Sequence, residues 1–263
     1  MAWYGSGGWD SYPPYVSVAE KKARGARALA KLLKKRKRAA EPVVAHRTRH
    51  VADTFWGRAW ADNLERYADF ANRLPRGRTY LRNGSVLDLA LARGRVEAYV
   101  AGSELYRVTI GIAPLAKTRW RRVVARCTGR IGSLVGLLRG ELSDDVRAVL
   151  SHAKDGLFPE PREMTLECSC PDSAEVCKHV AAVLYGVGIR LDARPELFFV
   201  LRQVDQAELL SSATAGAVSR RHPAPGKRIA DDRLSAVFGI ALAAAPPARP
   251  GTRRPPGVSN RRR

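Results

Sequence analysis

The sequence has no long hydrophobic run and few cysteines for its 263 residues. No apolar stretch approaches the roughly 20 residues that a membrane span needs, and the first thirty residues do not join a charged start to an apolar segment. Membrane insertion and secretion are therefore not expected, and the cytoplasm is the predicted location. Four cysteines in a chain of this length are too few for a disulfide scaffold.

The usual catalytic motifs are also missing. The sequence contains no GxxxxGK[ST] phosphate-binding loop, no GxSxG, no HExxH and no pair of carboxylates in a recognisable setting. It therefore predicts a protein that is not an enzyme, and any helicase activity would belong to another protein. Hydrophobic residues make up 45% of the chain, which is enough for a sizeable core.

Acidic residues are scarce beside basic ones, with 25 Asp and Glu against 46 Lys and Arg, for a net charge of +21. The excess lies at the two ends. Residues 20–50 hold twelve basic and two acidic side chains, and residues 215–263 hold eleven and two, whereas residues 51–214 are nearly neutral. A neutral body with basic arms is typical of a partner such as DNA or RNA. The alternative is that the arms are solvated tails that bind any polyanion weakly.

Composition divides the chain into four predicted segments. They are an aromatic and glycine-containing segment with a basic helix at 1–50, an α+β body at 51–160, a zinc-binding segment with following helices at 161–215, and a basic Pro/Arg-rich linker and tail at 216–263. The tail is too poor in apolar residues to fold. Its one apolar patch, at 234–242, either docks a partner or returns to the body as a helix.

Two helices are predicted before the body's strands. Ser17 and Glu20 form a capping box that begins a helix ending at about Arg38. The end of that helix, KKRKR at 34–38, either contacts phosphates or is a soluble terminus favoured by the helix dipole. A second helix begins at Asp53 or Thr54. Its apolar stripe is expected in the core rather than as a base-stacking surface, and comprises Trp56, Trp60, Leu64, Tyr67, Ala71 and Leu74.

The predicted fold class is α+β. Residues 78–112 alternate apolar and polar side chains in four short runs, separated by turn signals at Asn83-Gly84, Arg93-Gly94 and 101–103, which predicts an antiparallel β-meander. Residues 117–126 are read as a possible extension of the sheet. The other expected elements are helices over 128–139, from Ser143 toward Lys154 and within 194–215, a zinc-stabilised strand–turn–helix finger, and a disordered basic C-terminal tail.

One constellation carries specific chemistry, a CxC…CxH arrangement formed by Cys168, Cys170, Cys177 and His179. Three thiolates and one imidazole complete a tetrahedral Zn²⁺ site, with no position left open for catalysis. Cys168 and Cys170 lie two apart on an extended segment, so they project to the same face. Cys177 and His179 are expected at or just before a helix start, because two residues apart inside a helix they would diverge by about 200°. Zinc would then join a strand to a helix.

Other readings of these residues are weaker. Clustered cysteines can be buried hydrophobic residues, as Cys127 is expected to be. A redox pair is not supported because no CxxC occurs, and a nucleophilic Cys/His pair would not need three thiols. The remaining histidines are expected on the surface or in the core rather than as ligands: His46, His50, His152 and His222.

The segment CSCPDSAEVCKHVAAVLYGVG resembles the SWIM-type zinc finger, and TFWGRAWADNLE and GLFPEPRE extend a likeness to stand-alone bacterial SWIM zinc finger proteins over about residues 12–210. The resemblance implies that Cys168, Cys170, Cys177 and His179 bind zinc. It also implies a module that binds DNA or protein, with an SNF2-type helicase as a partner, and no known reaction. Ser173 departs from the family pattern, because relatives commonly carry Trp at this position. Any contact that the Trp side chain makes in relatives is therefore in doubt here.

The predicted function is a zinc-binding, non-catalytic module that associates with nucleic acid, DNA being favoured over RNA. The alternative is a protein-interaction adaptor, in which the finger or the 234–242 patch docks a partner and the arms bind polyanions without specificity. Lys178 is a predicted contact because it lies between the last two ligands. The full set of predicted contacts is Lys34, Lys35, Arg36, Lys37, Arg38, Lys178, Arg220, Arg221, Lys227 and Arg228.

Overall fold

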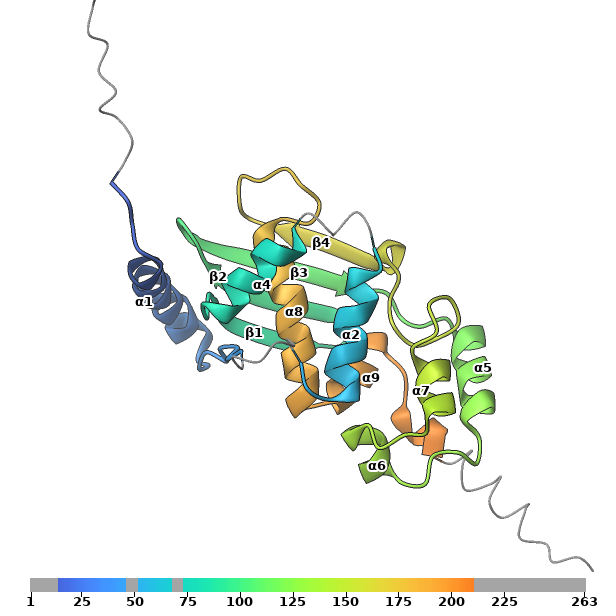
Figure 1. The fold of residues 1–263 in the computed structure, drawn as a ribbon. Helices are drawn as coiled ribbons and strands as arrows, with labels where there is room; N and C mark the ends of the chain where they lie inside the picture. Colours follow the sequence, from blue (N-terminus) through green and yellow to red (C-terminus); the bar gives the residue numbers. More distant parts are fainter. Residues whose placement is uncertain (1–13, 46–51, 68–72, 211–263) are drawn as a thin grey trace, which may run out of the picture. The chain divides into compact units, whose positions relative to one another are not determined.

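The computed structural model describes residues 14–45, 52–67 and 73–210, where helices and strands follow one another in the α+β class that the sequence predicts (Figure 1). All of these residues belong to the first of two units into which the chain divides, Met1–Ser219. The elements are α1 (Val18–Arg36), α2 (Phe55–Glu65), α4 (Leu74–Arg82), β1 (Val86–Ala92), β2 (Arg95–Ala101), β3 (Leu105–Ile112), α5 (Lys117–Cys127), α6 (Leu134–Arg139), α7 (Asp144–Leu150), the 3-10 helix η1 (Pro161–Glu163), β4 (Met164–Cys168), α8 (Lys178–Ala193) and α9 (Glu196–Arg202).

The four strands form one antiparallel sheet in the order β1-β2-β3-β4. The predicted turn at Arg93-Gly94 joins β1 to β2, with Gly94 at a φ of 66° that favours glycine. The turn at 101–103 joins β2 to β3, which confirms the meander for these three strands. β4 returns after residues 113–163 and pairs with β3, so that Cys168 lies opposite Val108. The sheet thereby brings the first cysteine of the cluster beside a strand far away in sequence.

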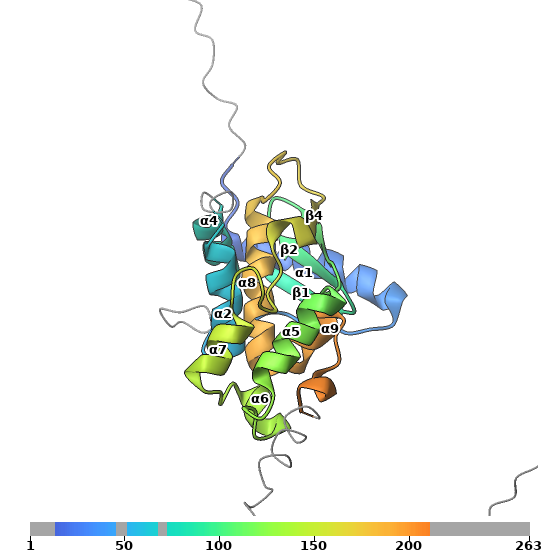
Figure 2. The ribbon, with the colours of Figure 1, turned by 90° about the vertical axis from the view of Figure 1, so that its right-hand side faces the viewer.

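The two faces of the sheet are covered by different helices (Figure 2). Val96, Ala98 and Val100 of β2 point into the main core, where α8 packs. Tyr99 points to the opposite face, because side chains alternate along a strand, and there it joins Leu29 of α1 in a smaller apolar cluster. The basic helix α1 is thus held against the outer face of the sheet by its apolar stripe.

Helix α8 lies between the sheet and the pair α2 and α4 (Figure 1). Every residue from His179 to Gly188 is buried, as expected for a helix that is apolar on all sides. Trp60 of α2 donates from its indole nitrogen to the carbonyl of Leu184 at 2.8 Å. Gly77 of α4 sits directly against α8, leaving no room for a side chain. The helix that begins at the cysteine cluster is therefore fixed from all sides.

The segment between β3 and β4 contains α5, α6 and α7 and is tied back by two buried arginines. Arg202 of α9 is fully buried and donates to the carbonyl of Ala113 at 2.8 Å and to Glu163 at 3.1 Å. Arg119 of α5 donates to the carbonyl of Gly156 at 2.6 Å and lies 3.4 Å from Glu163. Both cations meet one carboxylate at the start of β4, which fixes where that strand begins.

The sequence-based expectation of a strand at 78–82 with a hairpin at Asn83-Gly84 is wrong. These residues form α4 and its end, with Asn83 as C-cap and Gly84 at a φ of 67° in the turn before β1. Leu74, Gly77 and Leu81 recur at intervals of three and four residues, and all three are buried. Packing against α8 uses that helical spacing and overrides the strand-like alternation.

The long helix expected from residue 54 to residue 74 is two helices. Thr54 is the N-cap of α2 as predicted, but α2 ends at Glu65 and Leu74 begins α4. Ala71 lies outside the described residues. The prediction that the apolar stripe lies in the core is confirmed for Trp56, Trp60 and Leu64, which are at most 1% exposed.

The possible strand at 117–126 is also wrong, because these residues form α5. Trp120, Val123 and Cys127 are buried and are spaced three and four residues apart, which places them on one side of a helix. Cys127 is the core residue that the sequence predicts.

The remaining helices differ from expectation mainly at their ends. α1 ends at Arg36 instead of Arg38, α6 begins at Leu134, and α7 follows Ser143 but ends at Leu150. Within the described ranges, no helix is both long and apolar enough to cross a membrane. The aromatic segment before residue 14, the tail and the 234–242 patch lie outside the described residues, and the domain boundaries stay a prediction.

Candidate metal centre

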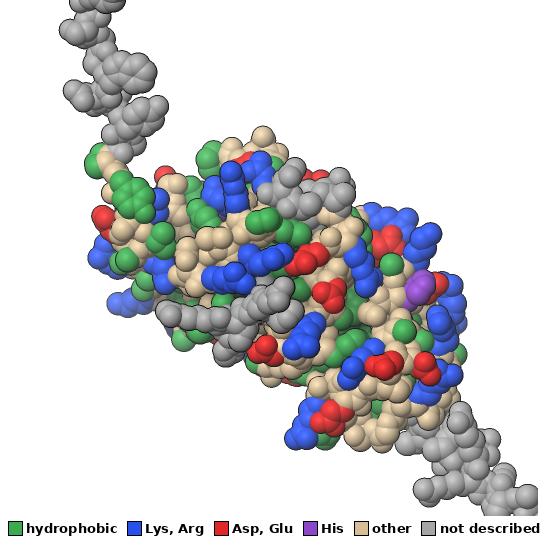
Figure 3. Space-filling model, viewed as in Figure 1, with side chains coloured by type: hydrophobic (Ala, Val, Ile, Leu, Met, Phe, Trp, Pro, Cys, Tyr) green, Lys and Arg blue, Asp and Glu red, His purple; other side chains and the backbone are tan. Residues whose placement is uncertain are grey.

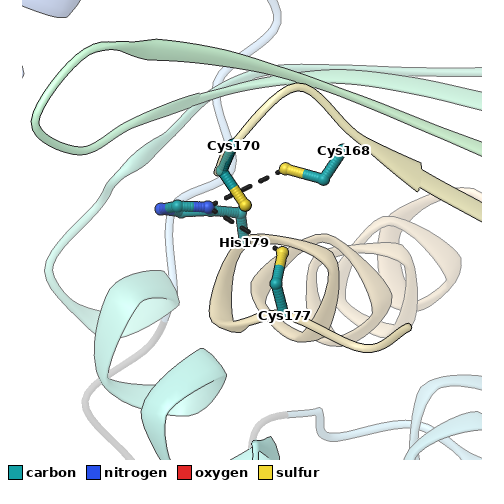
Figure 4. Close-up of side chains that lie close together, drawn as sticks. All are labelled: Cys168, Cys170, Cys177 and His179. Atoms are coloured by element: carbon teal, nitrogen blue, oxygen red, sulfur yellow. Dashed lines mark hydrogen bonds between the residues drawn. The ribbon is translucent and has the colours of Figure 1, made fainter. Parts of the chain in front are cut away.

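The cysteine and histidine cluster is assembled where a strand end meets a helix start (Figure 4). Cys168 is the last residue of β4, and Cys170 follows in the loop. Cys177 is the N-cap of α8, where its sulfur accepts from the backbone N–H of Val180 at 3.4 Å, and His179 lies in the first turn. The strand–turn–helix arrangement that the ligand spacing predicts is the one present.

The four side chains converge with the spacing that a tetrahedral ion requires. Their ligand atoms, three Sγ and one His ring nitrogen, all lie within 4.8 Å of one another. Nδ1 of His179 is 3.8 Å from Sγ of Cys168 and 3.9 Å from Sγ of Cys177. Zn–S and Zn–N bonds of ordinary length place sulfur and nitrogen about 3.6 Å apart across a tetrahedron. The two His179 distances exceed this value by a few tenths of an ångström, and the widest pair of ligand atoms would close by up to about 1 Å around Zn²⁺.

The thiols of this cluster are not equivalent. The pKa of Cys177 is lowered, because the Cys168 thiol hydrogen bonds to its sulfur and because His179 and the Val180 N–H interact with it, while burial acts in the opposite direction. The pKa of Cys168 is raised by the same contact and by burial. A thiolate at the N-cap also benefits from the positive end of the helix dipole. These surroundings favour the thiolate form of Cys177 over that of Cys168.

The imidazole of His179 is held between aromatic rings. Tyr106 stacks on it with ring centroids 4.4 Å apart, and Tyr80 meets it edge-on at 5.3 Å. Nε2 points away from the sulfurs, and a side chain at Gly102 would come within 3.1 Å of it. The ring is only 1% exposed. These three neighbours fix the ring so that Nδ1 faces the cysteines.

The sequence does not identify the residues that surround His179. Tyr80 was expected on a strand and is on α4. Tyr106 and Gly102 carry no motif of their own. The register of β3 with β4, in which Val108 faces Cys168, brings Tyr106 beside the loop cysteine, and the local sequence carries no signal of that register.

The segment that follows Cys168 is held at two points, Ser169 and Asp172. The N–H of Arg107 donates to the hydroxyl of Ser169 at 2.9 Å, which continues the strand pairing past Cys168. Asp172 accepts from the N–H of Ala174 at 3.2 Å and forms an ion pair with Arg73 at 3.5 Å. Ser173, the departure from the family pattern, is exposed in this loop and contributes no ligand atom to the cluster.

The predicted nucleic-acid contacts occupy different parts of the molecule. Nζ of Lys178 lies 6.0 Å from the centre of the Tyr80 ring, beside the metal cluster. Arg38 forms two bonds to the buried carboxylate of Asp88, at 3.0 and 2.5 Å, and Arg36 is 3.8 Å from Glu97. These two guanidinium groups therefore already have anionic partners.

The other predicted contacts divide into exposed and undescribed residues. The side chains at 34, 35 and 37 are exposed at the end of α1. Their role in binding stays a prediction, as does that of the four basic residues beyond the described part, Arg220, Arg221, Lys227 and Arg228.

Comparison with known proteins agrees with the geometry. The SWIM zinc finger family matches residues 147–187, a range that contains all four members of the cluster. Over 213 residues the chain is 33% identical to the uncharacterized protein Rv2102 of Mycobacterium tuberculosis, covering 77% of this chain and 76% of that protein. No solved structure matches the chain significantly.

Proposed function

Because this chain belongs to the SWIM zinc finger family, we propose that it is a non-catalytic module in which zinc stabilises a body that binds nucleic acid, DNA in the first place. Zinc binding itself rests on the Cys₃His cluster. Structural zinc of this kind joins a strand end to a helix start and contributes to folding. What the proposal adds to zinc binding is the partner, nucleic acid.

The observation that carries the proposal is the way α1 is presented. This helix holds eight Lys and Arg residues and the single acidic residue Glu20. Leu29 and Leu33 are buried against the outer face of the sheet, so the helix is docked on the body. Its other side is exposed, including Lys31 and Lys35. A fixed row of cations gains affinity for a polyanion by releasing counterions, without having to order itself first.

The test is a salt series of nucleic-acid binding by the full, zinc-loaded chain, followed by fluorescence anisotropy with single- and double-stranded DNA and RNA. The K31Q/K35Q variant removes two exposed cations of α1. On duplex DNA each lost phosphate contact reduces the steepness of log K against log salt by about 0.9, so a loss of about 1.8 is expected there, and about 1.4 on single strands.

The matched control is R139Q/R194Q, which removes the same charge from α6 and from the end of α8. Both side chains are exposed, by 70% and 46%, and each pairs with a carboxylate. If K31Q/K35Q and the control give the same slope, α1 is not a binding surface. If the zinc-loaded full chain binds no nucleic acid at low salt, the proposal fails, and the adaptor function becomes the working hypothesis. That an SNF2-type helicase is a partner of this protein stays a prediction.

A further inference from the structure

A second basic surface lies at the other end of the molecule, on helix α5. Its inner side buries Arg119, Trp120, Val123 and Cys127. Its outer side is exposed and carries Lys117, Arg121, Arg122 and Arg126, and Arg130 follows just beyond the helix. Basic side chains gather over this end of the molecule, where α5 and α7 lie (Figure 3). The sequence did not predict this surface, because a strand over residues 117–126 would have distributed these cations over two faces.

The charge of this surface is largely free. Residues 117–130 contain no acidic side chain. Within the described part of the chain, Arg122 pairs with Asp155 at 3.1 Å, and the other exposed cations of α5 form no ion pair. Two more carboxylates lie nearby, since Asp205 and Glu208 line the same open cavity as Lys117 and Arg121. Glu208 accepts a hydrogen bond from the Trp120 indole at 2.8 Å.

The cations of α5 form two rows with small residues between them. At 100° per residue, Lys117 and Arg121 lie on one side of the exposed face, and Arg122 and Arg126 lie about 140° away on the other. The line between the rows is occupied by small side chains, Thr118 and Ala125, both exposed. A helix with cations on both flanks and small residues along its crest matches a groove bordered by two phosphate backbones.

The helix is held rigidly from its inner side. The Arg119 guanidinium donates to the carbonyls of Gly156 at 2.6 Å and Phe158 at 3.0 Å. Trp120 is anchored by its indole nitrogen, and Cys127 is fully buried. Burial raises the pKa of the Cys127 thiol to about 11, as expected for a residue of the apolar core. The outer face is therefore presented on a helix that does not have to be ordered on binding.

We propose that α5 is a groove-binding helix that enters the major groove of B-form DNA, with Lys117 and Arg121 toward one backbone and Arg122 and Arg126 toward the other. The major groove of B-DNA, about 12 Å wide, admits an α-helix, and an α-helix with its side chains is about 10–12 Å across. The major groove of A-form RNA is too narrow for side chains to reach in. Duplex DNA is therefore the partner that fits, and this inference rests on the proposed nucleic-acid function.

The test compares the full chain with its R121Q/R126Q variant on a DNA duplex, an RNA duplex of the same sequence and single-stranded DNA. The variant takes one cation from each row, and both positions are exposed, so the fold is retained. On duplex DNA the salt slope is expected to fall by about 1.8, and affinity near 0.1 M salt by up to about 60-fold, since each contact contributes about 0.9 to log K relative to 1 M salt.

A second variant tests the crest rather than the charge rows. Ala125→Glu places a long anionic side chain between the two rows, and it is expected to reduce binding to duplex DNA more than binding to single-stranded DNA. R139Q/R194Q again serves as the control for net charge. Thermal unfolding of each variant verifies that the fold is intact.

The outcomes separate the two proposals. If the full chain binds no nucleic acid, the proposed function fails and this inference fails with it. If the full chain binds duplex DNA but R121Q/R126Q behaves like R139Q/R194Q, only the assignment of α5 is overturned. Equal losses on duplex DNA and duplex RNA, with a loss of slope of about 1.4 on single strands, overturn the groove geometry, because this is what a flat electrostatic surface gives from counterion release alone.

Discussion

Gly77 lies on the face of α4 that packs against α8, and its replacement by alanine tests how rigidly this junction is held. A Cβ at position 77 would be 2.4 Å from Cβ of Ala181, 2.7 Å from the carbonyl carbon of Ala181 and 2.8 Å from N of Ala182. Two of these atoms are backbone, so no change of rotamer relieves the contact. α8 cannot retreat, because the sheet lies behind it.

The magnitude follows from two opposing effects. Alanine in place of glycine favours an exposed helix by up to about 1 kcal/mol. Overpacking a close junction costs about 1–3 kcal/mol, and here α4 must move by about 1 Å to reach ordinary contact distance. Overpacking dominates at the upper end of that range, so a net loss of about 1–2 kcal/mol of unfolding free energy is expected. In a domain of this size that lowers Tm by roughly 2–8 °C.

Thermal unfolding of the zinc-loaded chain measures this effect, and G132A is its control. A Cβ at Gly132 meets nothing within 4 Å, so alanine there is expected to leave Tm unchanged or slightly higher. A second readout is zinc affinity, since α4 also carries Tyr80 to the ring of His179. A Tm for G77A equal to or above that of the parent would refute the close packing of α4 on α8.

Three further changes test single contacts. Gly102→Ala would place a methyl group 2.7 Å from the Tyr106 ring and 3.1 Å from Nε2 of His179, and chelator competition is expected to show roughly five- to 150-fold weaker zinc binding, from a cost of about 1–3 kcal/mol. Glu163→Gln is expected to flatten the dependence of stability on pH in the acid range. Trp60→Phe removes the buried hydrogen bond to the carbonyl of Leu184 and is expected to cost about 1–3 kcal/mol in urea unfolding.

The sign of the pH effect follows from the surroundings of Glu163. Burial raises its pKa, but the N–H of Glu160 and the charges of Arg202 and Arg119 outweigh burial, and the pKa is lowered overall. A lowered carboxyl pKa gives stability that is present above the pKa of the unfolded chain and is lost as pH falls through the folded value. An E163Q profile as steep as that of the parent would contradict this role.

The other two changes have their own contradicting results. Unchanged zinc affinity in G102A would show that the stacked rings of Tyr106 and His179 have room to move. Unchanged stability in Trp60→Phe would show that the indole hydrogen bond does not stabilise the junction of α2 with α8.

The metal cluster could be predicted from the sequence because its geometry is local. Cys168 ends β4 and Cys170 follows two residues later in the loop, while Cys177 and His179 lie at the start of α8, so the four ligands come from two short neighbouring stretches of the sequence. The aromatic neighbours could not be predicted, because Tyr106 and Tyr80 reach His179 through the register of β3 with β4 and through the packing of α4 on α8.

The errors in the two segments wrongly predicted as strands have one physical origin. Residues 78–82 and 117–126 are short, and within them alternating and helical spacing cannot be distinguished. What selects the helix is tertiary packing, since Gly77 allows α4 to approach α8 closely and Arg119 carries its charge inward to carbonyl groups of residues 156 and 158. The local sequence of each segment does not indicate these partners, which are α8 for α4 and the carbonyl groups of residues 156 and 158 for Arg119.

The central claim, that three cysteines and one histidine hold a structural zinc ion, is tested most directly by the zinc content of the purified full chain, determined by mass spectrometry of the metal. The parent is expected to hold one zinc per chain, and Cys177→Ala to lose it. Cys127→Ala is the control, because that buried thiol lies in the core away from the cluster, and it is expected to lose stability while it keeps the ion. Retention of stoichiometric zinc by Cys177→Ala, or its loss from Cys127→Ala, would contradict the account.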